Sequence, residues 1–213
     1  MNYLAHMVLG EAFGLADHGV VGNFMGDAVK GRFVERHWSP EVSQGIRFHR
    51  ALDATSDGHE ASREARALIR PHCGKWSGVV WDVLADHVLA SHFGRLAPRC
   101  GTLEAFAARQ LEVVEEGLPF MPERSVRFFR AMVRHQWLTG YFDKQVVADV
   151  LQAMSTRRAV AGPVAEGMKA YEQHQDRLDA CGAALMAAMV VWAQSEMLAE
   201  SLSLTCKGSE SVP

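Results

Sequence analysis

The run Phe48-His49-Arg50-Ala51-Leu52-Asp53-Ala54-Thr55-Ser56-Asp57 places one histidine and two aspartates at intervals of one helical turn. Ser39 and Pro40 have the residue types preferred at the N-cap and first position of a helix, so we expect a helix to begin there. One face of that helix is apolar at first and titratable further along, with the residues Val42, Ile46, His49 and Asp53. We expect this stripe of side chains to begin in the hydrophobic core and to end at residues that can take part in chemistry.

A second segment, residues 79–89, repeats this arrangement. Asp82 and Asp86 are one turn apart and in line with Val79 and Leu89. A histidine or carboxylate that faces a core must be paired or coordinated, because burying it bare costs several kcal/mol. Metal binding is one solution. The alternatives are a buried hydrogen-bonded pair for His49 and Asp53, and an exposed helix face for the second pair of aspartates.

Composition indicates a soluble globular protein. The chain has 213 residues, 48% of them hydrophobic and 22% charged, which suits one large domain or two small ones. A formal charge of −3 gives no overall attraction to nucleic acid or to an anionic membrane, and neither partner is expected. The four cysteines lie far apart without C-x-x-C spacing, so they do not indicate a zinc knuckle. The first residues lack the pattern of a signal peptide, and a cytoplasmic location is expected.

The order of elements predicts an all-α protein, a single helical bundle over residues 1–202 with a disordered tail at 203–213. Helices are expected at 3–10, 40–57, 59–70 (ending before Pro71), 76–94, 102–116, 123–138, 143–158 and 163–199. No run alternates as a strand does. Residues 180–195 are uncharged but shorter than the roughly 20 residues that cross a bilayer, which favours a buried helix. Glycines punctuate residues 14–31, an irregular segment expected to approach another backbone closely.

Several motifs occur in the order typical of the acyl carrier protein phosphodiesterase family, and the chain resembles that family over nearly its whole length. The motifs are Asn2-Tyr3-Leu4-Ala5-His6, Gly22-Asn23-Phe24-Met25-Gly26-Asp27-Ala28-Val29-Lys30-Gly31, Gly45-Ile46-Arg47-Phe48-His49-Arg50 with Asp53 and Asp57, Asp82-Val83-Leu84-Ala85-Asp86-His87, Trp137-Leu138 with Tyr141, and Ser155-Thr156-Arg157-Arg158. Small departures, such as Ala51 where a basic residue is usual, affect the fit to the carrier protein more than the ligand types.

The resemblance implies a fold like that of HD phosphohydrolases and a divalent metal, typically Mn²⁺, with Mg²⁺ or Fe²⁺ as alternatives. It also implies the reaction, which is hydrolysis of the phosphodiester between 4′-phosphopantetheine and a serine of holo acyl carrier protein, giving the apo protein. A metal suits this chemistry because it neutralises the anionic ester and lowers the pKa of a water. The resemblance indicates no oligomeric state.

Roles for individual residues follow as hypotheses. The metal ligands are expected to be Asp27, His49, Asp53 and Asp86, with Asp82 either a ligand or a group that orients an imidazole. His87 is the expected proton donor to the leaving serine oxygen, and His6 and Asn23 are further catalytic candidates. Phosphate binding is assigned to Lys30, Arg47 and Arg50. Docking of the acidic carrier protein is assigned to Arg157 and Arg158, with a solvated helix face as the alternative.

Other readings stay open at this point. Asp57 is either a ligand or the cap of the next helix. His6 is otherwise a hydrogen-bonded core histidine, and Asn23 and Asp27 are otherwise turn residues. The same ligand set also suits a metal-dependent phosphohydrolase that acts on a small nucleotide. A helical binding protein without catalytic activity is the third possibility.

Overall fold

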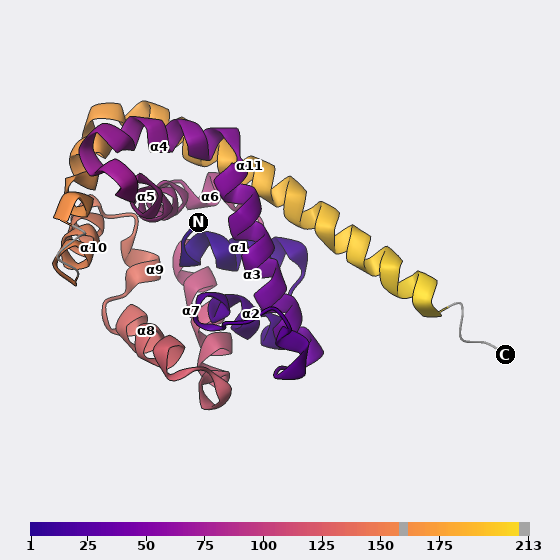
Figure 1. Cartoon of the computed structure of the whole chain (residues 1–213). Coiled ribbons are helices and arrows are strands. Elements are labelled where there is room, and N and C mark those ends of the chain that lie inside the picture. The colour runs from indigo at the N-terminus through magenta and orange to yellow at the C-terminus, as the bar shows by residue number, and fades with distance from the viewer. Residues whose placement is uncertain (158–161, 209–213) are drawn as a thin grey trace.

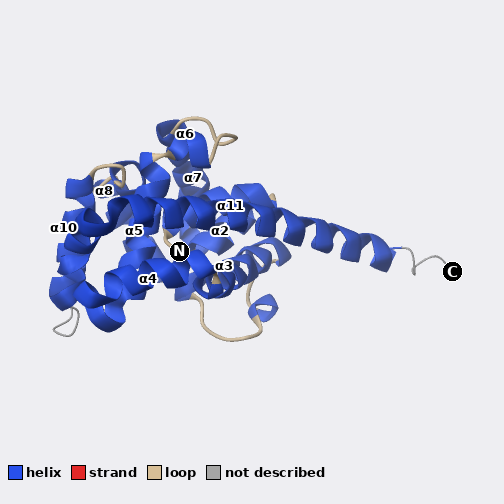
Figure 2. Ribbon diagram, turned by 90° about the horizontal axis from the view of Figure 1, so that it is seen from above, coloured by secondary structure: helices blue, strands red, loops and turns tan. Residues whose placement is uncertain are grey.

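The structure is a computed structural model that describes residues 1–157 and 162–208. Within these residues the chain forms helices and no strand, which confirms the all-α prediction (Figures 1 and 2). The α-helices are α1 (Tyr3–Phe13), α2 (Asp17–Phe24), α3 (Pro40–Gly58), α4 (Glu60–Cys73), α5 (Ser77–Ser91), α6 (Phe93–Leu96), α7 (Leu103–Glu116), α8 (Glu123–Arg134), α9 (Trp137–Gly140), α10 (Lys144–Arg157) and α11 (Gly167–Gly208). The 3-10 helices are η1 (Gly26–Ala28), η2 (Val34–Arg36), η3 (Gly74–Trp76), η4 (Leu118–Phe120) and η5 (Gly162–Glu166).

Helix α3 begins where the sequence predicts. The Ser39 side chain accepts a hydrogen bond from the backbone N–H of Val42 at 3.3 Å, and Pro40 occupies the first turn. Val42, Ile46 and His49 are buried on the predicted face. The helix therefore carries its titratable residues toward the centre of the molecule.

The glycine-rich segment contains a helix that the sequence analysis missed. Residues Asp17–Phe24 form α2, which packs along α3. The packing is so close that a Cβ atom on Gly45 would lie 1.9 Å from the backbone oxygen of Gly19. The predicted close backbone approach is thus confirmed, and α3 is the element that is approached.

Several helix boundaries differ from the prediction. Helix α4 continues past Pro71 to Cys73. The expected helix 123–138 is split into α8 and α9 by Gln136, which has a left-handed backbone with φ of 49°. Helix α11 extends to Gly208, beyond the expected start of the tail at residue 203.

Helix α11 has 42 residues with non-helical backbone angles at His174, and its C-terminal end projects from the rest of the molecule (Figures 1 and 2). Leu178, Leu185 and Met189 are buried where it packs against α1, α4 and α5. By length and composition alone the span Pro163–Glu200 is apolar enough to cross a membrane, with a mean hydropathy of 1.3 in its best window. A core helix passes the same test, but only 33% of that window is buried, so the helix that was predicted to be buried is buried along one face only.

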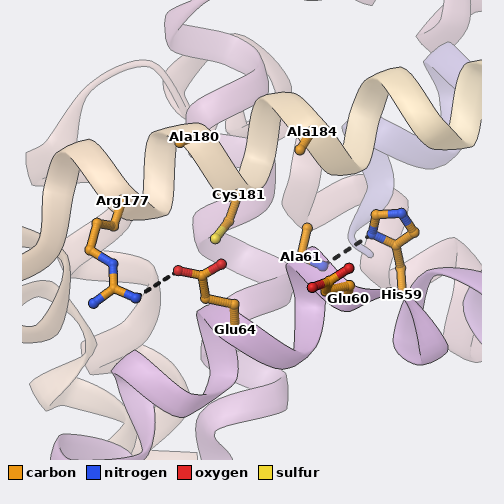
Figure 3. Close-up of a pocket in the computed structure, with 8 residues that line it drawn as sticks. All are labelled: His59, Glu60, Ala61, Glu64, Arg177, Ala180, Cys181 and Ala184. Carbon is orange, nitrogen blue, oxygen red and sulfur yellow. Dashed lines mark hydrogen bonds and ion pairs between the residues drawn. The ribbon is translucent and has the colours of Figure 1, made fainter.

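A small pocket of about 340 Å³ lies between α4 and α11 (Figure 3). At one end the Arg177 guanidinium binds the Glu64 carboxylate at 2.7 Å. At the other end the His59 ring caps α4, accepting a hydrogen bond from the backbone N–H of Ala61 at 3.2 Å. None of the site residues predicted from the sequence lines this pocket.

The close contact between α2 and α3 gives a stability prediction. Gly45→Ala should lower the free energy of unfolding by about 2 kcal/mol, because the added methyl group overlaps backbone atoms of α2. Gly58→Ala is the matched control, since its Cβ would meet no atom within 4 Å. Urea denaturation of both variants measures the difference. Equal stability of the two variants would show that α2 and α3 do not pack this closely in solution.

Candidate metal centre

Residues from α1, η1 and α3 converge on one cluster of titratable groups. His6 and His49 stack with their ring centroids 4.2 Å apart, and the Asp53 carboxylate faces both rings. One ligand atom from each of His6, His49 and Asp53 lies within 4.8 Å of the others. The stripe on α3 therefore ends beside His6, in a group of residues of ligand type.

Asn23 determines which nitrogen of His6 carries a proton. The Asn23 amide N–H donates to the backbone oxygen of His6 at 2.8 Å, which orients its Oδ1 toward His6 Nδ1 at 3.2 Å. An oxygen acceptor at that position requires a proton on Nδ1. In a neutral ring Nε2 then carries a lone pair, and it faces Asp53 Oδ1 at 2.9 Å. A lone pair at that distance from a carboxylate is repelled, and either a proton on Nε2 or a metal ion between the two atoms would relieve the repulsion.

His49 is held in the same cluster without a satisfying hydrogen bond. Its Nε2 is 3.4 Å from Asp27 Oδ1 and 3.3 Å from Asp53 Oδ2. Neither of its buried ring nitrogens makes a well-formed hydrogen bond to the described part of the chain. Gly26 allows the ring to sit there, because a Cβ atom on residue 26 would lie 2.4 Å from it. Buried polar atoms of this kind are uncommon and point to a missing partner.

The charges of the cluster are strongly coupled. Burial, together with the neighbouring His49, lowers the pKa of His6 to about 4. Burial opposes protonation of His49 as well, but the carboxylates of Asp27 and Asp53 raise its pKa to about 9. Burial would raise the pKa of Asp53, yet the two imidazoles hold it well below its usual range. Without a metal, the cluster therefore has a neutral His6, a protonated His49 and an ionised Asp53 near neutral pH.

The donor set fits a divalent cation. Two imidazole nitrogens and carboxylate oxygens from Asp53 and Asp27 are ligand types that suit Mn²⁺ or Fe²⁺. The unpartnered nitrogens of His49 and the lone pair of His6 are the positions that such an ion would satisfy. The bond from Asn23 to His6 is the kind of outer contact that fixes a metal-binding tautomer.

Asp82 lies beside the cluster. Its Oδ1 is 3.2 Å from the amino group of Met1, which is also 3.5 Å from Asp53 Oδ1. Burial raises the pKa of Asp82, and the positive amino group opposes that rise. The structure therefore links Asp82 to the cluster through an intervening cation and does not bring it within the group of ligand atoms.

Asp86 is placed differently from the hypothesis. Its two carboxylate oxygens accept hydrogen bonds from the backbone N–H groups of Leu4 at 2.8 Å and Ala5 at 3.1 Å. These are unpaired donors at the start of α1, where the Asn2 side chain provides no cap. Asp86 thus caps α1 from α5, and it positions His6 instead of joining the ligand atoms.

His87 also lies apart from the cluster. Its Nδ1–H donates to the backbone oxygen of Tyr141 at 2.7 Å, and its ring meets the edge of Tyr171. Burial lowers its pKa. The ring is on the side of α5 that faces α9 and α11, so the structure does not bring the expected proton donor to the candidate metal.

The cationic residues assigned to phosphate have other partners. Lys30 donates to the backbone oxygen of Asp27 at 3.4 Å, and Arg47 pairs with Glu35. Arg50 holds the loop that follows η1, because it donates to the backbone oxygens of Gly31 and Val29 at 2.9 and 3.0 Å.

Asp57 lies outside the cluster, and the docking hypothesis concerns residues that the structure does not describe. Asp57 forms an exposed ion pair with Arg66 at 3.2 Å. Since His59 is the cap of α4, Asp57 serves neither expected role. Arg158 lies outside the described residues, as does the side chain of Arg157. Docking at those two arginines stays a prediction.

A cavity of about 1020 Å³ opens beside the cluster, with Asp27 and Asp82 in its wall. Aromatic side chains form much of the remaining surface, namely Tyr3, Phe24, Trp76, Phe128 and Trp137. Arg124 and Arg127 of α8 also line it. The sequence analysis did not single out these arginines, although the arginine-rich segment 123–134 was visible. A cavity with a polar end and an aromatic body suits a ligand with a charged group and a long chain.

Comparison with known proteins now places the chain. A family model described as acyl carrier protein phosphodiesterase matches residues 1–189. The chain belongs to the acyl carrier protein phosphodiesterase family. It is 34% identical over 179 residues to the acyl carrier protein phosphodiesterase of Yersinia pestis, covering 84% of this chain and 90% of that protein.

Two further relatives carry the same name. The protein from Yersinia enterocolitica is 31% identical over 198 residues, covering 93% of this chain and all of the relative. The protein from Photorhabdus laumondii is 32% identical over 180 residues, covering 84% of this chain and 88% of the relative. No solved structure matches the chain significantly, so the likeness to HD phosphohydrolases stays a prediction.

The placement of Asp86 can be tested directly. Asp86→Ala should lower the free energy of unfolding by about 2 kcal/mol, because it leaves two buried N–H groups at the start of α1 without acceptors. Chemical denaturation in the presence of EDTA measures this loss without any contribution from metal. An Asp86→Ala protein that keeps its metal-free stability but loses metal binding would instead identify Asp86 as a ligand.

The pKa values of the cluster predict a pH dependence of the metal-free protein. His49 has a higher pKa in the folded chain than in the unfolded one, so its contribution is complete below pH 6.5 and is lost as pH rises toward 9. The loss should be on the order of 2–3 kcal/mol. Thermal melts of EDTA-treated protein between these pH values measure it. Asp53→Asn should flatten the decline, and a wild-type melting temperature that is constant or rises toward pH 9 would contradict the assignment.

Proposed function

We propose that this chain is a metal-dependent hydrolase that releases 4′-phosphopantetheine from the serine of holo acyl carrier protein and leaves the apo protein. The family supports the reaction, and its relatives are named for it. The observation that carries the metal dependence is the contact between His6 Nε2 and Asp53 Oδ1, in which Asn23 turns a lone pair of His6 toward a carboxylate. Mn²⁺ is the proposed ion, held by His6, His49, Asp53 and Asp27.

A divalent metal bound there would supply a water of lowered pKa and offset the charge of the phosphodiester. The residues of the chain prepare the site for that ion. Asn23 fixes the tautomer of His6, and Gly26 leaves room for His49. Asp86 anchors the first turn of α1, so that His6 cannot shift along the helix axis. These contacts reduce the motion that would otherwise misalign the ligands.

The cavity supports a substrate with a long arm. Its wall joins Asp27 and Asp82 at the cluster to the aromatic rings of Trp76 and Trp137. The phosphodiester would lie at the charged end and the pantetheine arm along the aromatic surface. Arg124, in the same wall, is the proposed partner of a phosphate oxygen, because guanidinium groups bind such oxygens by paired hydrogen bonds.

The decisive assay is mass spectrometry of a holo acyl carrier protein incubated with the enzyme and Mn²⁺. Metal-dependent hydrolysis should remove about 340 Da, the mass of the phosphopantetheine group, and EDTA should prevent the loss. Asp53→Asn should lower the rate by more than about 100-fold, because it removes a ligand and the partner of both imidazoles.

Asp57→Asn is the matched control on the same helix, because exposed Asp57 lies one turn further on and pairs only with Arg66 within the described residues. Its rate should stay within about threefold of the wild type. The proposal fails if holo carrier protein keeps its mass in the presence of Mn²⁺. It fails equally if both aspartate variants keep full activity.

A further inference from the structure

Helix α8 is the most basic element that the structure describes in full. It carries Arg124, Arg127, Arg130 and Arg134 against a single glutamate, Glu123, in a chain whose formal net charge is −3. All four arginines are exposed. At 3.6 residues per turn they fall within about 120° of one another around the helix axis. They form one row, which we call the arginine row.

The arginine row is held rigidly beside the candidate metal centre. Phe129 and Met132, on the opposite side of α8, are buried in the core. Phe128 stacks on Tyr3 with ring centroids 4.4 Å apart, and Tyr3 belongs to the same helix as His6. Arg124 and Arg127 line the cavity that contains Asp27 and Asp82. The row therefore runs from the mouth of that cavity onto the outer surface.

Most of this positive charge is not neutralised within the described part of the chain. Arg127 pairs with Glu123 at 2.7 Å, and both side chains are largely exposed. Within the described residues no carboxylate lies within 4.0 Å of Arg130 or Arg134, and neither side chain makes a hydrogen bond. Arg124 acts on the buried Tyr3 hydroxyl, lowering a pKa that burial raises. An exposed row of arginines without counter-charges attracts an acidic partner electrostatically.

We propose that the arginine row of α8 is the docking surface for an acidic protein, which in the reaction proposed above is the acyl carrier protein. The proposal rests on that function and adds where the protein part of the substrate binds. A carrier protein seated on Arg127, Arg130 and Arg134 would present its modified serine at the mouth of the cavity. The arm would then extend past Arg124 toward the metal cluster. Charge complementarity at such a surface acts mainly on the association rate and its salt dependence.

Binding of fluorescently labelled apo carrier protein tests the surface without turnover. Anisotropy titrations would compare the wild type with R127E/R130E/R134E and with R127A/R130A/R134A. Arg124 is left intact, because it is assigned to the phosphate. Charge reversal should weaken binding by about 10- to 100-fold at about 50 mM salt, and neutralisation should weaken it less. At about 300 mM salt the gap between wild type and reversal should narrow, because screening removes the attraction.

The control R63E/R95E/R99E makes the same change of net charge at exposed arginines on α4, on α6 and in the loop after α6. In Figure 1, α4 lies at the opposite side of the molecule from α8. The Kd of this control for the carrier protein should be within about twofold of the wild-type value if the effect is local and not due to total charge. Equal weakening by both triple variants, or no weakening by the α8 reversal, would overturn the proposal, as would a wild type that does not bind the carrier protein.

The hydrolysis assay separates this proposal from the proposed function. If the wild type removes phosphopantetheine and the α8 reversal does so with unchanged kcat/KM, the reaction stands and the docking surface is wrong. If the wild type removes nothing, the proposed function fails, and the titration alone decides whether α8 binds an acidic protein. Circular dichroism should show unchanged helicity for all variants, since every substituted side chain is exposed.

Discussion

The Asp53 carboxylate, set between two buried imidazoles, is the constraint on which the site depends. It faces His6 from α1 and His49 one turn earlier on α3, and it also lies 3.5 Å from the amino group of Met1. Groups of this kind are costly to bury unless a counter-charge satisfies them. The two rings stack on each other with their centroids 4.2 Å apart, within closely packed helices. Gly26, under the ring of His49, is the clearest sign of that packing.

Much of this could be predicted from sequence because it rests on local spacing. The cap at Ser39 follows from the residue types preferred at the start of a helix. The period of a helix predicts the apolar stripe of α3 and the spacing of one turn between His49 and Asp53. The all-α class follows from the same period repeated along the chain. Glycines in the segment before α3 correctly indicated a close approach, although the helix α2 that makes it was hidden by its own glycines, which are poor helix formers.

The features that could not be predicted from sequence are contacts between distant segments. Helical spacing placed Asp86 on an inward face of α5, but it could not show that unpaired N–H groups of α1 meet it there. His87, about 100° further round the same helix, faces Tyr141 and Tyr171 for the same reason. The arginines of α8 were visible in sequence, and only the fold shows that two of them border the cavity. Which distant residues contact one another is determined by how the helices pack, and the helical period of the sequence does not show it.

One stripe of side chains on α3 thus leads to a candidate metal centre, a cavity and a proposed surface for a protein substrate. All three depend on the proposal that the cluster around Asp53 binds a divalent metal. A crystal grown with Mn²⁺ and measured at the manganese absorption edge would locate that metal. We expect an anomalous peak within bonding distance of His6 Nε2, His49 Nε2 and the Asp53 carboxylate. A peak between Asp82 and Asp86, or direct hydrogen bonds from His6 and His49 to Asp53 with no metal, would contradict it.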